Sequence, residues 1–259
     1  MAILEQPNSD NQLMYDLSFM YTKRCDLECP FCMYSSNPRI TETLDLNQLH
    51  WWLKSVRYPK IASLGAYGGE VGVDLEGWDK IFYQLPIHIP KFVITNGTWS
   101  TDPKRTDDFL DFCARWKMHV VVSGTPEHRK HQNRSVLEDL KAEQPETFTL
   151  KPKEENFHPM GKLEGKMLGY HCSYKCMWWN RALRICVMPE GDILFQNCDG
   201  SYPIVGTICE EFPIIDQRLQ EMRVNQGGFL PVCQFAKDWK ENINGKYKSK
   251  QEIQRILQG

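Results

Sequence analysis

The chain has 259 residues, which is enough to bury the full core of one barrel-sized domain. Basic and acidic residues number 31 and 33, so the net charge is −2 and gives no general affinity for polyanions. The polar N-terminus lacks a signal-peptide pattern and no stretch approaches ~18 apolar residues, so we expect a cytoplasmic protein without a membrane span.

Strand and helix patterns alternate through the N-terminal part of the chain. Strand patterns occupy residues 15–21, 61–66, 91–95, 118–123 and 147–151, and helical patterns occupy 47–56, 75–84, 103–116 and 135–143. This alternation predicts parallel strands joined by crossover helices. About five or six such units are too few for a closed eight-stranded barrel.

Three of the ten cysteines follow the first strand pattern on one short loop. Cys25, Cys29 and Cys32 have the spacing C-x-x-x-C-x-x-C, and we call them the cysteine triad. Iron–sulfur clusters normally take four cysteines, so three thiolates can bind three irons of a cubane and leave the fourth iron open to a small molecule. A zinc site is the alternative, although it usually has four ligands in paired spacings. Ten cysteines without a signal peptide also indicate metal binding in a reducing compartment.

Polar segments stand at the ends of three further strand patterns. Gly68-Gly69-Glu70 follows the second strand, Thr95-Asn96-Gly97 ends the third, and Ser123 ends the fourth. In parallel barrels the chemistry lies at the carboxyl ends of the strands. We therefore expect these segments to meet the cysteine triad at one end of the sheet.

Together, the cysteine triad, Gly68-Gly69-Glu70 and Thr95-Asn96-Gly97 resemble the motifs of the radical S-adenosylmethionine (SAM) superfamily, in matching order over residues 15–160. The resemblance implies an α/β fold, a partial (β/α)6 TIM-like barrel, for a core of residues 12–160. Many members continue Gly-Gly-Glu with Pro and Leu, whereas this chain continues with Val71 and Gly72. That departure weakens the transfer of any particular subfamily's substrate.

The resemblance implies an oxygen-sensitive enzyme in which a [4Fe–4S] cluster on the cysteine triad binds SAM at its open iron. One electron, from a donor such as flavodoxin or ferredoxin, would cleave SAM to methionine and a 5′-deoxyadenosyl radical that removes hydrogen from the substrate. That substrate would be a small or nucleotide-like molecule undergoing isomerisation, dehydrogenation or carbon–carbon bond formation. The alternatives are a maturase of a peptide or protein, including glycyl-radical activation, and a non-catalytic zinc or nucleic-acid-binding module.

The resemblance also implies roles for the strand-end residues. Glu70 would accept a charge-assisted hydrogen bond from the methionine ammonium, and Gly68 and Gly69 would allow a close backbone approach. Phe31 would pack near the adenine, or simply pack within its loop. Contacts to the ribose or carboxylate are implied for Thr95, Asn96 and Ser123, for which strand-end capping is the alternative.

Residues 161–259 are predicted to form a C-terminal extension with a helix over 239–257. A β-hairpin is predicted from 183–188 and 193–198, with its turn at Gly191, and it resembles the twitch or SPASM extensions of the superfamily, which hold auxiliary clusters. Six residues, instead of the usual four, separate Gly191 from the next cysteine. The candidates for an auxiliary iron–sulfur cluster are Cys172, Cys176, Cys186 and Cys198, and ordinary buried thiols are the alternative.

Substrate-binding residues are less marked, and no residue is assigned as catalytic. Glu127, His128 and His131 follow the fourth strand, where they would either line the pocket or begin a surface helix. Thr149 and Lys151 share one face of the fifth strand. If that face is inward, Lys151 would be a cation in the lumen suited to a carboxylate or phosphate.

Overall fold

The computed structural model describes residues 14–152, 183–195 and 202–225 of the chain. Within them, the strands form one open sheet in the order β5-β4-β3-β2-β1-β6-β7-β8. The neighbours from β5 to β6 in this order are parallel, and β7 and β8 are antiparallel to their neighbours. The strands are β1 (Tyr15–Met20), β2 (Ile61–Tyr67), β3 (Lys91–Thr95), β4 (Met118–Val122), β5 (Phe148–Leu150), β6 (Leu183–Val187), β7 (Asp192–Phe195) and β8 (Ile204–Thr207).

The helices between the parallel strands begin at polar caps. Side chains of Asp45, Asp74, Asp102 and Asn133 accept hydrogen bonds from the first backbone N–H groups of α1, α2, α3 and α5, which would otherwise lack partners. The helices are α1 (Leu46–Ser55), α2 (Leu75–Phe82), α3 (Pro103–Trp116), α4 (Pro126–Lys130), α5 (Arg134–Glu143) and α7 (Phe212–Asn225), with 3-10 turns η1 (Tyr58–Lys60), η2 (Val71–Val73) and η3 (Thr98–Thr101). None of these helices combines the length and apolar character that a membrane span requires.

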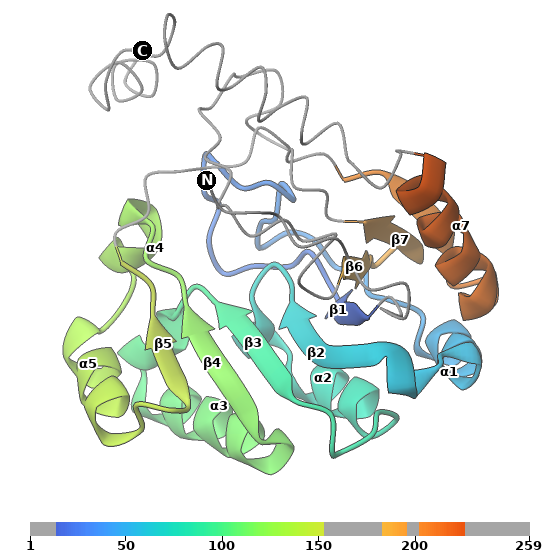
Figure 1. Cartoon of the computed structure of the whole chain (residues 1–259). Coiled ribbons are helices and arrows are strands. Elements are labelled where there is room, and N and C mark those ends of the chain that lie inside the picture. The colour runs from blue at the N-terminus through green and yellow to red at the C-terminus, as the bar shows by residue number, and fades with distance from the viewer. Residues whose placement is uncertain (1–13, 153–182, 196–201, 226–259) are drawn as a thin grey trace, which may run out of the picture.

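Side chains alternate between two faces of the sheet. One face packs against the helices, two of which, α2 and α3, lie behind β2–β4 in Figure 1, and it carries the fully buried Leu17, Val93 and Val120. The other, inner face carries partly buried residues that lie in register across the strands. Those residues include Asp16 with Ser63, Phe92 with His119, and Val121 with Thr149, and the exposed Arg184 pairs with Asp16 on the same face. The parallel strands therefore form an open sheet that helices cover on one face, and the carboxyl ends of these strands lie at the same edge of the sheet.

The predicted hairpin is confirmed, and it continues this sheet. β6 pairs in parallel with β1, and β7 returns antiparallel beside β6. Gly191 closes the turn with φ of +88°, a left-handed conformation that favours glycine. The hairpin therefore extends the sheet beside the strand that precedes the cysteine triad.

The sequence analysis did not predict the strand β8 or the helix α7. The inward side of α7 is formed by Phe212, Ile215, Asp216 and Leu219, all of which are buried. The Asp216 carboxylate accepts hydrogen bonds from Tyr15 (2.6 Å) and Lys60 (2.5 Å), so a buried ion pair fixes α7 against β1 and η1. The helix predicted over 239–257 lies outside the described residues.

Candidate metal and cofactor site

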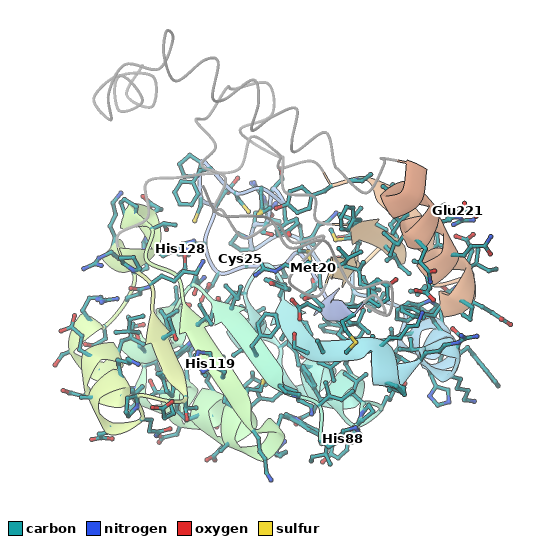
Figure 2. The ribbon with its side chains drawn as sticks, viewed as in Figure 1. Met20, Cys25, His88, His119, His128 and Glu221 are labelled. Atoms are coloured by element: carbon teal, nitrogen blue, oxygen red, sulfur yellow. The ribbon has the colours of Figure 1, made fainter. Side chains whose placement is uncertain are left out.

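The cysteine triad lies on the loop that leaves β1, at the carboxyl ends of the parallel strands. Figure 2 places Cys25 at this end, on the same side as His128, whereas His88 lies at the opposite end of the sheet. Cys25 and Cys29 are buried, Cys32 is half-buried, and none of the three forms a disulfide. The predicted meeting of the triad with the strand ends is confirmed by the contacts described below.

Backbone hydrogen bonds shape the loop around the sulfurs. The N–H of Leu27 donates to Cys25 Sγ at 3.4 Å, and the N–H of Ser36 donates to Cys32 Sγ at 3.3 Å. The loop is also closed by the N–H of Cys25, which donates to the carbonyl of Asn37 at 3.2 Å. The sulfurs of Cys25 and Cys32 therefore each accept a backbone N–H donor.

Gly69 joins this loop to the end of β2. Its N–H donates to the carbonyl of Thr22 at 3.0 Å, and the N–H of Glu70 donates to the carbonyl of Arg24 at 3.0 Å. A Cβ atom at Gly69 would lie 2.0 Å from the Arg24 carbonyl oxygen. Glycine at position 69 therefore allows the backbone after β2 to lie directly against the cysteine loop.

Glu70 is buried at the end of β2, with 2% of its surface exposed. One carboxylate oxygen accepts from Thr95 Oγ1 at 2.6 Å and from the N–H of Gly72 at 3.0 Å, and the other accepts from the N–H of Asn96 at 2.7 Å. Burial raises the pKa of Glu70 to about 7, against the opposing effect of these hydrogen bonds. The residue ties the end of β2 to the end of β3.

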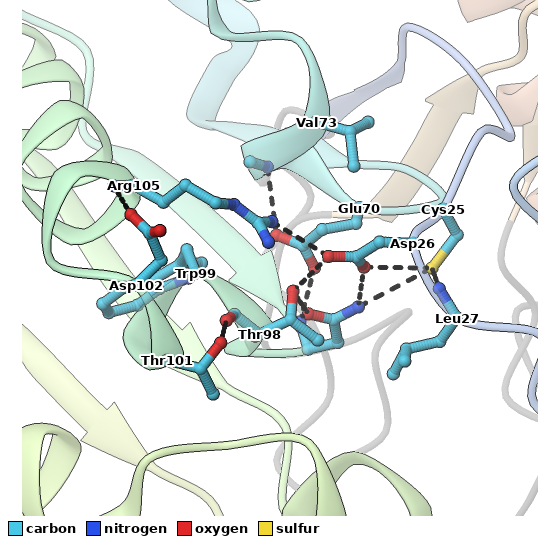
Figure 3. A network of polar contacts seen from close by, with 12 residues as sticks. Cys25, Asp26, Leu27, Glu70, Val73, Thr98, Trp99, Thr101, Asp102 and Arg105 are labelled. Carbon is cyan, nitrogen blue, oxygen red and sulfur yellow. Dashed lines mark hydrogen bonds and ion pairs between the residues drawn. The ribbon is translucent and has the colours of Figure 1, made fainter.

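Asp26, between the first two cysteines, is a central residue that the sequence analysis missed. Its carboxylate accepts from Thr98 Oγ1 at 2.5 Å and from Asn96 Nδ2 at 2.9 Å, and it forms an ion pair with Arg105 at 2.9 Å (Figure 3). Burial opposes its ionisation, but these three donors outweigh burial and lower the pKa of Asp26. The cysteine loop is thus anchored to β3, η3 and α3.

Asn96 connects both carboxylates with the triad. Its backbone N–H donates to Glu70, while Nδ2 donates to Asp26 and to Cys25 Sγ at 3.6 Å. Its carbonyl accepts from Gln132 Nε2 at 2.6 Å, and the same nitrogen donates to the carbonyl of Ser123 at 2.8 Å. Gln132, also missed from the sequence, therefore holds the ends of β3 and β4 together.

The other predicted residues lie around this centre or outside the described residues. The ring centroids of Phe31 and His128 lie 5.8 Å apart, so the cysteine loop contacts α4. The exposed His131 directly follows α4, and its Nε2 lies 3.6 Å from a carboxylate oxygen of Glu127, as the surface-helix alternative predicts. Cys186 is on β6, where burial raises the pKa of its thiol to about 12. Cys172, Cys176 and Cys198 are outside the described residues.

The donor set fits an iron–sulfur cluster. Thiolates suit iron–sulfur clusters, and hydrogen bonds to the ligating sulfurs are part of how proteins hold and tune them. The triad places three cysteines without disulfides on one loop, and backbone N–H groups are directed at the sulfurs of Cys25 and Cys32. Among the described residues, no three His, Cys, Asp or Glu side chains converge in a group suited to a single metal ion.

No protein-family model and no curated protein matches the sequence. Among solved structures, BtrN in complex with AdoMet and 2-DOIA is 18% identical, with a TM-score of 0.51 over 82% of this chain and 86% of that chain. Native anSMEcpe with bound AdoMet is 13% identical, with a TM-score of 0.44 over 78% and 80% of the two chains. SuiB of Streptococcus suis is 13% identical, with a TM-score of 0.33 over 70% and 60%.

These neighbours are radical SAM enzymes. At such identities, the likeness to BtrN establishes a shared fold and leaves the substrate open. The chain has the fold of the radical SAM enzymes, as its motifs predict.

Proposed function

We propose that the chain is a radical SAM enzyme that cleaves SAM reductively and abstracts hydrogen from a substrate. The observation that carries this proposal is the direct hydrogen bonding between Cys25 and Asn96, and between Asn96 and Glu70, at one end of the sheet. Three motifs that lie far apart in the sequence thereby form one site.

The cysteine triad would hold a [4Fe–4S] cluster, and Asn96 with the N–H groups of Leu27 and Ser36 would support its sulfurs. When bound, the reduced cluster with its open iron supplies the electron that breaks the sulfur–carbon bond of SAM. Glu70 would orient Thr95 and Asn96, in addition to the contact with the methionine ammonium that the resemblance implies.

Phe31, Gly68, Thr95, Asn96 and Ser123 would line the bound SAM, because all five belong to the loop or to the strand ends around the triad. The contact between Phe31 and His128 narrows the space between the cysteine loop and α4. Such enclosure would exclude water from the reacting atoms.

We propose a polar small molecule as the substrate. On the inner face, the Asp16 carboxylate accepts from Ser63 Oγ at 2.5 Å and lies 3.9 Å from Arg184, and His119 Nε2 lies 2.8 Å from Thr149 Oγ1. These groups lie near the amino ends of their strands, so they would hydrogen-bond the part of a polar substrate that extends along the inner face away from the cysteine triad. The similar structure of BtrN contains AdoMet together with a second ligand, 2-DOIA.

The test uses the full chain, reconstituted anaerobically with iron and sulfide. We expect oxygen-sensitive iron, and 5′-deoxyadenosine after addition of SAM and dithionite. The variant that changes all three triad cysteines to alanine should form none, whereas Cys209→Ala, at an exposed thiol, should match the wild type. Reductive cleavage by the triple variant would remove the triad from the proposed role.

A further inference from the structure

The side-chain amide of Asn96 has an orientation that its neighbours determine. Its Oδ1 accepts from the backbone N–H of Thr98 at 2.9 Å, and its Nδ2 donates to the Asp26 carboxylate at 2.9 Å. A backbone N–H can only donate and an ionised carboxylate can only accept, so both contacts require the same orientation of the amide. The nitrogen is therefore the atom that faces Cys25 Sγ, at 3.6 Å.

Cys25 Sγ receives donors from the backbone and from a side chain. Leu27 supplies a backbone N–H at 3.4 Å, and the Asn96 amide supplies the second donor from the end of β3. Cys32 Sγ accepts the backbone N–H of Ser36, which belongs to its own loop. The Asn96 donor, in contrast, comes from the segment that follows β3, and Thr98 and Asp26 orient its side-chain amide.

Hydrogen bonds to the sulfurs of an iron–sulfur cluster help to set its reduction potential. An N–H dipole directed at a ligating sulfur stabilises the added negative charge, so it favours the reduced cluster. The Asp26 carboxylate nearby would have the opposite effect, but its charge is paired with Arg105. The side-chain amide of Asn96 donates both to the Asp26 carboxylate and to Cys25 Sγ, so it contacts the sulfur directly.

We propose that Asn96 is a positioning residue that raises the reduction potential of the cluster by donating a hydrogen bond to Cys25. This inference rests on the proposed function, because it requires a cluster on the triad. It assigns to Asn96 a role toward the cluster that is separate from any contact with SAM.

The competing explanation is that Asn96 only holds the strand ends together. Gln132 provides the matched control, since its amide bonds the carbonyl groups of Asn96 and Ser123. Gln132→Ala should loosen the same strand ends and leave the donor to Cys25 in place. A purely structural role for Asn96 predicts that both substitutions shift the potential alike.

The experiment is a redox titration of the reconstituted full chain, followed by the EPR signal of the reduced cluster. At a solution potential equal to the wild-type midpoint, we expect the oxidised-to-reduced ratio to rise about tenfold in Asn96→Ala, a negative shift of about 59 mV for one electron. Asn96→Ser should shift in the same direction, because its hydroxyl can still accept from Thr98 but is too short to reach Cys25. Gln132→Ala should keep the wild-type midpoint.

An unchanged midpoint in both Asn96 variants, or an equal shift in Gln132→Ala, would overturn the inference. It would also be overturned if both Asn96 variants lost the cluster while Gln132→Ala retained it, since Asn96 would then act by holding the loop. Failure of the proposed function is distinguishable, because the wild-type chain itself would then bind no cluster or form no 5′-deoxyadenosine.

Discussion

Gly69→Ala tests whether the glycines after β2 are required for packing against the cysteine loop or only for the approach of a ligand. The new Cβ would lie 2.0 Å from the Arg24 carbonyl oxygen and 2.5 Å from that of Lys23, and both contacts are backbone atoms. Relief requires separation of the loop from β2, with loss of the two backbone hydrogen bonds that join them. Each hydrogen bond is worth about 1 kcal/mol and the overpacking costs about 1–3 kcal/mol, so we expect the free energy of unfolding to fall by about 3–5 kcal/mol.

Gly68→Ala is the matched control, because its Cβ would meet its nearest neighbour, the Thr22 carbonyl oxygen, at 3.3 Å. Neither glycine has a positive φ, so only space distinguishes them. The assay is urea unfolding of the metal-free chains, followed by iron content after reconstitution. We expect Gly68→Ala to remain within about 1 kcal/mol of the wild type and to bind iron normally. Equal stability and equal iron in the two variants would refute the reasoning.

Three further predictions concern protonation, the core and the extension. The metal-free chain should lose stability as the pH rises from about 5 to 8, because burial raises the pKa of Glu70 from its ordinary 4.5 to about 7. Protonated Glu70 contributes about 3 kcal/mol to the free energy of unfolding. This contribution is complete below the pKa of Glu70 in the unfolded chain and is lost as the pH rises through its pKa in the folded chain. Urea titrations should show the loss in the wild type and not in Glu70→Gln, and equal pH profiles would contradict the prediction. Lys60→Met should lower the free energy of unfolding by about 3–5 kcal/mol, since it leaves the buried Asp216 charge without its cationic partner. Lys80→Met, at an exposed pair, should lower it far less; equal losses in thermal or urea unfolding would show that the buried pair is not required. If the C-terminal cysteines hold a second cluster, iron should approach about eight per chain and about four should remain in the triad variant; a folded triad variant without iron would exclude it.

Local patterns predicted the central elements well. The bounds of α3 agree with prediction because Asp102 caps it, Pro103 suits its first turn and Lys117 ends it in a left-handed conformation. The amphipathic spacing of Phe212, Ile215 and Leu219 also signals α7, and it was overlooked. The parallel pairing of the hairpin with β1 depends on contacts that a local pattern does not contain.

Most of the residues that meet in the candidate site were predicted, whereas the contacts between them were not. The triad, Glu70 and Asn96 stand in recognisable motifs, but Asp26 lies 79 residues from its partner Arg105. Spacing alone cannot pair such residues, because the fold brings them together. For the same reason, a local pattern does not indicate that Gly69 lies against the carbonyl of Arg24.

The central claim is that the cysteine triad makes SAM cleavage possible, and one measurement tests it most directly. This is quantitation of 5′-deoxyadenosine from SAM and dithionite, with the anaerobically reconstituted wild type and triad variant side by side. We predict product in the wild type, none in the triad variant, and the wild-type amount in Cys209→Ala. Product from a triad variant that is folded and freed of contaminating enzyme would contradict the account, as would a wild-type chain that holds its cluster and yields none.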